Sequence, residues 1–255
     1  MKRDSVQSLE RAFDLLEALA AGGEMGVTEL ANRTGLVPST AHRLLHTLAK
    51  RGYVRHSAGS GRYLLGYKVV EVASGLEQRR ERLRAIARPH LEGIQRATGE
   101  TVNLVVLEGD RVVYVDQVEG SRNVRMFTTV GTSVPAHTTG SGKAMMAFGA
   151  PEAPAALYAG RELERLTGRT LTTLAALEDD FKRIRRRGYA LDNEEHEEGV
   201  GCVAAPVFDH TGLPCGAISV SGPTARILHE HSSALGALLI ARAADVSAAL
   251  GHRAA

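Results

Sequence analysis

The chain has 255 residues, of which 44% are hydrophobic and 24% are charged, a length that suits two domains with a buried core each. Only two cysteines occur, Cys202 and Cys215, which excludes a disulfide scaffold and favours a reducing compartment. No apolar run approaches the ~20 residues of a membrane span and residues 1–5 do not begin a signal-peptide core, so we expect a soluble, cytoplasmic protein.

Charge is distributed unevenly along the chain. The first 84 residues carry 14 lysines and arginines against 9 acidic residues, whereas the remainder carries 17 against 20. No acidic residue occurs between Glu29 and Glu71. A basic segment ahead of a mildly acidic body is typical of a nucleic-acid-binding domain joined to a second domain, and the alternative is a solvated basic surface.

The first 65 residues predict a winged helix-turn-helix. Apolar residues at helical spacing indicate a helix over 7–20, which Gly22 and Gly23 end. Thr28 is a candidate N-cap of a second short helix, and Pro38 suits the first turn of a third. Two short strands, 53–56 and 62–65, flank a glycine-rich turn and form the wing.

The third helix is the candidate DNA-reading element, because its outer side is polar and basic. A helix of this kind enters the major groove, where its N-terminal half reaches base edges. Arg43 fits a guanine, while Ser39 and Thr40 fit a base or a phosphate, and Arg62 on the wing fits a phosphate or the minor groove. The full predicted DNA-binding set is Thr28, Ser39, Thr40, His42, Arg43, Thr47, Arg51 and Arg62.

The remaining residues predict an α+β domain. A helix over 66–82 joins the two domains, and a basic amphipathic helix pattern follows over 83–98. Strands are predicted at 101–107, 112–118, 202–208 and 217–220, with a turn at Gly109-Asp110. Helices are predicted at 141–149, 174–187 and 226–250.

Two features of this domain indicate a ligand site. Backbone N–H groups at Gly140–Gly142 precede a helix and form a candidate anion site, although the P-loop pattern is not met. Alternation places the hydroxyls of Ser219 and Ser221 on one face of a strand, where they line a cavity or, alternatively, face solvent.

An enzyme is the rival interpretation. Cys202 with a histidine would supply a thiol nucleophile, and His196 with nearby glutamates and Cys202 would supply a metal site. A small residue on an apolar strand is more often a packing residue, and the spacing matches no standard zinc pattern. The acidic run over 193–198 is typical of a solvated loop. A purely architectural DNA-binding protein, a third class, would not need the long α/β segment.

Four motifs in this order resemble the IclR family of bacterial transcriptional regulators and extend over nearly the whole chain. They are Val37–Leu45 with Gly52-Tyr53, His137–Ala144, Glu198–Val207 and Ala217–Pro223.

The resemblance implies a winged helix-turn-helix over 1–65, a linker helix over 66–82 and a GAF-like effector-binding domain over 83–255. The family's pocket for small acids corresponds to Gly140, Ser141, Asp192, Cys202, Ser219 and Ser221, with apolar walls from Met126, Val134 and Val200.

The function that follows is that of a non-enzymatic regulator without a cofactor, expected to be a repressor of a catabolic operon. It would bind a palindromic double-stranded operator as a homodimer, with tetramers built as dimers of dimers. A small organic acid or ureide, such as glyoxylate, pyruvate or allantoate, would release it by binding the DNA-free arrangement more tightly.

Overall fold

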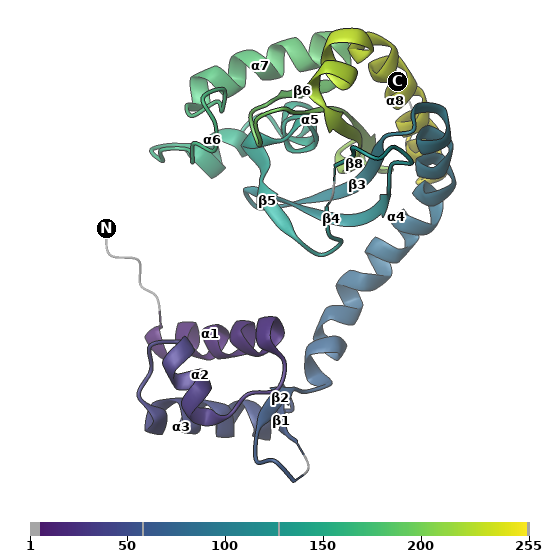
Figure 1. Ribbon diagram of the computed structural model, residues 1–255. Coiled ribbons are helices and arrows are strands. Elements are labelled where there is room, and N and C mark those ends of the chain that lie inside the picture. Colours follow the sequence, from purple (N-terminus) through teal and green to yellow (C-terminus); the bar gives the residue numbers. More distant parts are fainter. Residues whose placement is uncertain (1–5, 58, 127, 254–255) are drawn as a thin grey trace. The chain divides into compact units, whose positions relative to one another are not determined.

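The structure is a computed structural model that describes residues 6–57, 59–126 and 128–253. The chain divides into two compact units, one ending at Arg79 and the other beginning at Arg80, which we describe separately (Figure 1). Residues 1–5, on which the signal-peptide prediction falls, and Ala58 in the wing turn lie outside the described residues.

The first unit contains the predicted helix-turn-helix and wing. Its elements are α1 (Gln7–Gly22), α2 (Val27–Arg33), α3 (Pro38–Lys50), β1 (Val54–His56) and β2 (Tyr63–Leu65). The two strands pair in antiparallel fashion. The core consists of side chains from all three helices and both strands, among them Leu15, Leu30, Leu45, Val54 and Tyr63. The winged helix-turn-helix prediction is therefore confirmed.

Two glycines account for the turns between these helices. Gly23 and Gly35 have φ angles of +72° and +67°, a region that residues with a Cβ rarely enter. The predicted capping role of Thr28 is wrong, because α2 begins one residue earlier and its N-cap is Gly26, which offers no side-chain hydrogen bond.

A single helix, α4 (Lys68–Thr98), covers both the predicted linker helix and the predicted amphipathic helix. Within the second unit it presents Leu83, Ala87, Leu91 and Ile94 to the core. Their spacing of three or four residues keeps them on one side of the helix.

The second unit is built on a six-stranded antiparallel sheet in the order β5-β4-β3-β8-β7-β6. The strands are β3 (Thr101–Glu108), β4 (Arg111–Val118), β5 (Ser133–Pro135), β6 (Ala190–Asn193), β7 (Val200–Phe208) and β8 (Pro214–Pro223). The four predicted strands are confirmed, and the two outer strands were not predicted because three or four residues carry too little alternation.

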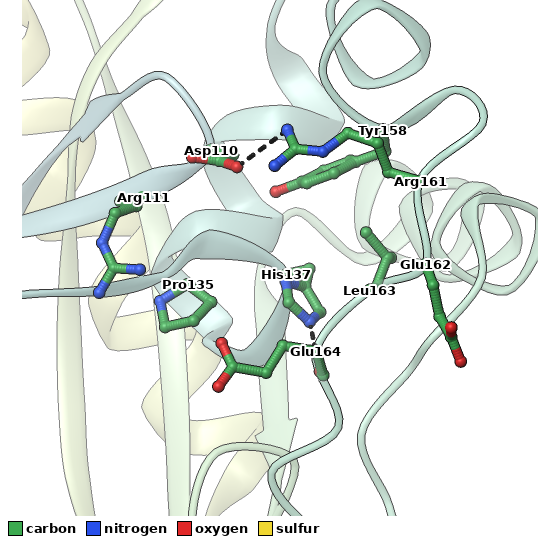
Figure 2. A pocket seen from close by; sticks show the side chains of 9 residues that line it. All are labelled: Asp110, Arg111, Pro135, His137, Tyr158, Arg161, Glu162, Leu163 and Glu164. Carbon is green, nitrogen blue, oxygen red and sulfur yellow. Dashed lines mark hydrogen bonds and ion pairs between the residues drawn. The ribbon is translucent and has the colours of Figure 1, made fainter. Parts of the chain in front are cut away.

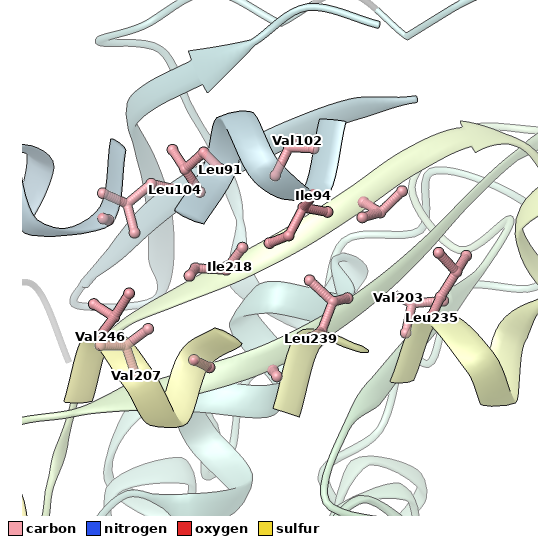
Figure 3. Packing of buried hydrophobic residues seen from close by; sticks show 14 of the residues in the cluster. Leu91, Ile94, Val102, Leu104, Val203, Val207, Ile218, Leu235, Leu239 and Val246 are labelled. Atoms are coloured by element: carbon pink, nitrogen blue, oxygen red, sulfur yellow. The ribbon is translucent and has the colours of Figure 1, made fainter. Parts of the chain in front are cut away.

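Helices cover both faces of this sheet. The second part of α4 and helix α8 (Ser232–Ala249) share one apolar cluster with the sheet, which includes Ile218, Val203 and Leu239 (Figure 3). A second cluster joins the sheet to α5 (Gly140–Phe148), α6 (Ala153–Tyr158) and α7 (Leu174–Arg187). The predicted α+β architecture is confirmed, and α6 is a helix that the sequence did not predict.

The last predicted helix, 226–250, is interrupted. Its first turns form a π-helix, Ala225–Glu230, and α8 starts only at Ser232. Among the described residues α8 alone is long and apolar enough to cross a membrane by length and composition. In the fold, Leu235, Leu239 and Val246 of this helix are buried in the core of the second unit.

Candidate functional site

A row of polar side chains crosses four strands on the sheet face that α5 covers. Asp192 pairs with Cys202, Cys202 with Ser221, and Ser221 with Thr101. Residues directly opposite each other in antiparallel strands point to the same face, so the four side chains form one line. Each is at most 8% exposed. The row therefore brings three of the predicted effector residues together and adds Thr101.

A second row lies two residues along the same strands. Ser219 is opposite both Asn103 and Ala204. The amide of Asn103 donates to the Ser221 hydroxyl at 3.5 Å, which links the two rows. Ser219 is 2% exposed, so the alternative of a solvent-facing serine pair is wrong.

The segment after β4 closes over these rows. The Thr101 hydroxyl donates to the carbonyl oxygen of Met126 at 2.8 Å, and the Thr128 hydroxyl donates to Asn103 Oδ1 at 2.8 Å. The predicted wall residue Met126 thus reaches the row through its backbone. Val200 lies two residues before Cys202 on β7, and Val134 lies on the edge strand β5.

Helix α5 begins directly above the first row. A Cβ atom on Gly140 would lie 3.3 Å from both the Asp192 nitrogen and the Cys202 sulfur, so only glycine fits without a shift. The predicted cluster of open amides is partly wrong, because the Thr139 hydroxyl caps the helix and accepts from the Gly142 nitrogen at 3.0 Å. Ser141 is buried in the first turn.

Burial controls the protonation of the row. It raises the pKa of Asp192 to about 7, with a further rise from the charge of Glu195 and an opposing effect of Lys143. Burial also raises the pKa of the Cys202 thiol to about 12, although the hydroxyls of Ser221 and Ser219 hydrogen-bond the sulfur and oppose the shift. Cys202 is consequently a neutral thiol at physiological pH.

Several residues that the sequence did not single out belong to this region. Thr101 and Asn103 stand in an apolar strand, and only the pairing of distant strands shows their role. Tyr114 is a third, since burial and the charges of Cys202 and Asp192 raise the pKa of its phenol.

The predicted solvated loop over 193–198 is wrong at Glu195. Its carboxylate is buried and accepts from Lys143 Nζ at 2.5 and 2.7 Å. Lys143 Nζ also lies 3.0 Å from Asp180 Oδ2 on α7. The charge pattern of the run gave no indication of the partner Lys143, which lies on helix α5.

In the first unit, most of the predicted DNA-binding side chains are on the surface. Thr40 is half-buried, and the remaining members on α2, α3 and the residue after α3 are exposed: Thr28, Ser39, His42, Arg43, Thr47 and Arg51. The outer side of α3 therefore presents a polar and basic face.

Arg62 on the wing has partners within the unit. Its Nη2 donates to Glu29 Oε2 at 2.7 Å and to the carbonyl oxygen of Glu24 at 2.9 Å. These contacts fasten the wing to α2 and to the turn that precedes it.

Comparison with known proteins agrees with this arrangement. A family model described as "IclR helix-turn-helix domain" matches residues 8–58, and one described as "Bacterial transcriptional regulator IclR C-terminal" matches residues 77–248. The chain belongs to the IclR family of transcriptional regulators.

Relatives of the IclR family are similar along nearly the whole chain. The HTH-type transcriptional regulator BhcR of Paracoccus denitrificans is 39% identical over 248 residues, which cover 97% of this chain and 88% of that protein. The transcriptional repressor IclR of Escherichia coli is 38% identical over 249 residues, covering 96% and 90%. A solved IclR homologue from Microbacterium hydrocarbonoxydans, complexed with 4-hydroxybenzoate, has a TM-score of 0.76 at 25% identity and covers 95% and 98%.

Family membership identifies the chain as a ligand-responsive DNA-binding regulator and replaces the enzyme interpretation, because IclR-family regulators are not enzymes. The high pKa of Cys202 also argues against a thiolate nucleophile. His196, the other residue of that interpretation, lies with its Nδ1 3.0 Å from the Thr138 hydroxyl. Within residues 6–57, 59–126 and 128–253, no group of three or more histidine, cysteine, aspartate or glutamate side chains is arranged to hold a metal ion.

A cavity of about 210 Å³ lies elsewhere in the IclR C-terminal domain (Figure 2). The Asp110–Arg161 ion pair, 3.1 Å long, and the Tyr158 ring form part of its wall. His137 Nε2 donates to the carbonyl oxygen of Glu164 at 2.9 Å across it. None of its lining residues belongs to the predicted effector set.

Proposed function

We propose that this IclR-family regulator represses a catabolic operon and that a small organic acid releases it from its operator. The observation that carries the proposal is the pair of buried polar rows beneath the start of α5, centred on Asp192, Cys202 and Ser221. Polar groups are costly to bury unless they are hydrogen-bonded, and several that converge in an otherwise apolar interior are typical of a ligand site.

The chemistry of the rows favours a small ligand that both donates and accepts hydrogen bonds. Hydroxyls of Ser219 and Ser221 and the amide of Asn103 serve either role. The absence of a side chain at Gly140 lets the start of α5 approach Asp192 and Cys202 closely. Because Asp192 has a pKa of about 7, it accepts a carboxylate ligand most readily when it is protonated. Allantoate and the hydrated form of glyoxylate both donate and accept hydrogen bonds, whereas pyruvate offers acceptors alone and depends on the protein for every donor. The relative bound to 4-hydroxybenzoate supports an organic acid.

On the DNA side, α3 enters the major groove and its exposed residues read and position the duplex. Arg43 contacts a guanine, whereas Thr47 and Arg51 follow the backbone. A homodimer places two such helices about 34–36 Å apart and so matches a palindrome, and two dimers form the tetramer. The protein acts in the cytoplasm, where operator and effector are both accessible.

Release follows from differential affinity. A ligand shifts a two-state equilibrium only by the difference between its affinities for the two states. The effector therefore binds the DNA-free arrangement more tightly than the DNA-bound arrangement.

The proposal is tested with the full chain and its own upstream promoter fragment, labelled with fluorescein for anisotropy at low salt. We expect retention of the fragment without effector, and release by at least one of glyoxylate, pyruvate, allantoate and 4-hydroxybenzoate. If the protein binds the fragment but none of the acids releases it, the proposal of a small organic acid as effector is wrong. If the protein does not bind the fragment, the proposal that this promoter contains its operator is wrong.

A further inference from the structure

Lys143 is the most deeply buried charged side chain of the second unit that the structure describes, and effector binding as proposed above does not use it. It is 1% exposed and lies on α5, two residues after Ser141. Its ammonium group contacts two carboxylates, those of Glu195 and Asp180. A buried ammonium group is tolerated only when it is fully paired, so these contacts hold three segments together.

One of these partners is also the partner of Asp192. The backbone nitrogen of Glu195 donates to Asp192 Oδ1 at 2.8 Å. Glu195 therefore binds Lys143 through its side chain and the carboxylate of Asp192 through its backbone nitrogen. If the side chain of Glu195 is displaced, its backbone N–H, which orients Asp192, is displaced with it.

The loop between β6 and β7 needs such support. Glu194 has a φ of +60°, the one positive φ among the non-glycine residues that the structure describes. A residue in this region persists when its surroundings hold it there, and such residues cluster at ligand sites. Hydroxyls of Thr167 and Thr170 bind the carbonyl oxygens of Glu194 and Glu195 at 2.7 and 2.6 Å. Those contacts hold the backbone of the loop, while Lys143 holds the side chain of Glu195, the one buried residue of the described loop 194–199.

The ammonium group of Lys143 is in direct contact with the Glu195 carboxylate. Asp180 has a second partner, Arg183, whose Nε lies 3.2 Å from its outer oxygen, and the charge of Arg187 acts on both Asp180 and Glu195. Removing the lysine charge therefore leaves neighbouring carboxylates that repel one another. Repulsion would move Glu195, since residues 197–199 of its loop are exposed, whereas α7 is anchored by the buried side chains of Leu177, Phe181 and Ile184.

We propose that Lys143 is a positioning residue of the effector site. Through Glu195 it holds the loop between β6 and β7 in the conformation that orients Asp192, the cross-strand neighbour of Cys202. This inference depends on the proposed function for its effect on the ligand, but its effect on the loop does not require a ligand.

The first experiment measures the loop without any ligand. Cys202 and Cys215 are both free thiols, one fully buried in the polar row and one half-buried on β8. Labelling with N-ethylmaleimide, followed by mass spectrometry of the two peptides, gives a rate for each cysteine in the same molecule. Lys143→Met should raise the rate at Cys202 at least about tenfold relative to Cys215, because local opening exposes one site alone. An unchanged ratio of the two rates would overturn the proposal.

Asp116→Asn is the matched control. Asp116 is another buried carboxylate paired with a basic side chain, Arg88, at 2.9 Å, and its asparagine still accepts from the Gln117 nitrogen through Oδ1. We expect it to lower the thermal midpoint without changing the ratio. An equal rise in the ratio for both variants would mean general loosening and would also overturn the proposal.

The second experiment measures the effector. Lys143→Met should raise the glyoxylate, pyruvate, allantoate or 4-hydroxybenzoate concentration needed for operator release at least about tenfold, with operator affinity unchanged within about twofold. The double variant Lys143→Met/Glu195→Gln removes the repulsion and should recover the thermal midpoint but not the effector response. Recovery of both would show that the lysine only stabilises the fold and would overturn its positioning role. If the unmodified protein responds to none of the acids, the proposed effector class is wrong, and the labelling ratio alone decides the role of Lys143.

Discussion

Asp192 and Cys202 lie opposite each other on β6 and β7, and both side chains point to the buried face beneath the first turn of α5. A carboxylate and a thiol in this position are deprived of water, which disfavours their charged forms. Both groups are consequently neutral over a wider pH range than usual, with pKa values raised to about 7 and about 12. The row thus resembles a set of neutral donors and acceptors more than a charged site.

This raised pKa predicts a pH-dependent stability difference for Asp192→Asn. The folded state favours the protonated form of Asp192. The stability that this preference gives the folded protein is fully present below pH 4 and is lost as the pH rises through 7. Asparagine cannot ionise and still offers Oδ1 to the Glu195 nitrogen. Relative to the unmodified protein, the variant should gain on the order of 2–4 kcal/mol in unfolding free energy between pH 4.5 and pH 8. Urea denaturation at several pH values measures this, and parallel stability curves would contradict the assignment.

Two kinds of DNA contact proposed for α3, base reading by Arg43 and phosphate contact by an exposed basic residue such as Lys50, predict different effects of mutation. Arg43→Ala should cost ~1–3 kcal/mol at the operator and relax the preference for one base pair, because a bidentate guanine contact is lost. Lys50→Ala, at the end of the same helix, should weaken binding to all sequences alike and reduce the salt slope by about one. Anisotropy titrations on the operator and on base-substituted operators separate the two. Equal effects of both variants on every sequence would refute the reading role of Arg43.

The contact between Arg62 and Glu29 predicts that an acidic residue limits DNA affinity. Both side chains are about half-exposed, so the ion pair contributes only ~0–1 kcal/mol to folding. Glu29→Gln should free the guanidinium for a phosphate and remove a nearby negative charge. We expect operator affinity to rise about two- to fivefold at low salt and the gain to vanish at high salt. Glu17→Gln on α1 serves as the control, and weaker binding by Glu29→Gln would show that the wing needs the pair.

The apolar cluster shared by the sheet, α4 and α8 predicts the cost of a core mutation. Ile218 is fully buried in the cluster that also contains Leu104 (Figure 3). Its neighbours on the adjacent strands are Leu104 and Ala205. Ile218→Ala removes buried methyl groups and leaves a cavity, so it should destabilise the second unit by ~2–5 kcal/mol. Calorimetry of the full chain measures the loss, and a change below about 1 kcal/mol would contradict the observed packing.

Alternation in the sequence is enough to predict that Ser219 and Ser221 share a face, because strand side chains alternate with a period of two. It does not predict their partners. Thr101 and Asn103 come from a strand more than a hundred residues earlier, and their position follows from the sheet order, which depends on long-range pairing.

Charge patterns misled the sequence-based interpretation at one place. Glu195 stands in a run of acidic residues typical of a solvated loop, yet its carboxylate is buried against Lys143, which lies 52 residues earlier. Burial of a charge depends on a partner that only the tertiary fold brings near. The sequence predicts the place of Arg62 on the wing but not its bonds to Glu24 and Glu29, because only the tertiary fold brings these residues together.

The central claim is that the polar rows beneath α5 decide whether the regulator leaves its operator. The most direct measurement is effector-driven release of the fluorescent operator from the unmodified chain, from Ser219→Ala/Ser221→Ala and from the control Ser233→Ala on an exposed part of α8. The loss of two buried hydroxyls should raise the effector concentration for half-release by at least about tenfold. The operator affinity of the double variant should equal that of the unmodified chain. Ser233→Ala should match the unmodified chain in both operator affinity and effector concentration for half-release. Release of the double variant at the same effector concentration as the unmodified chain would contradict the claim.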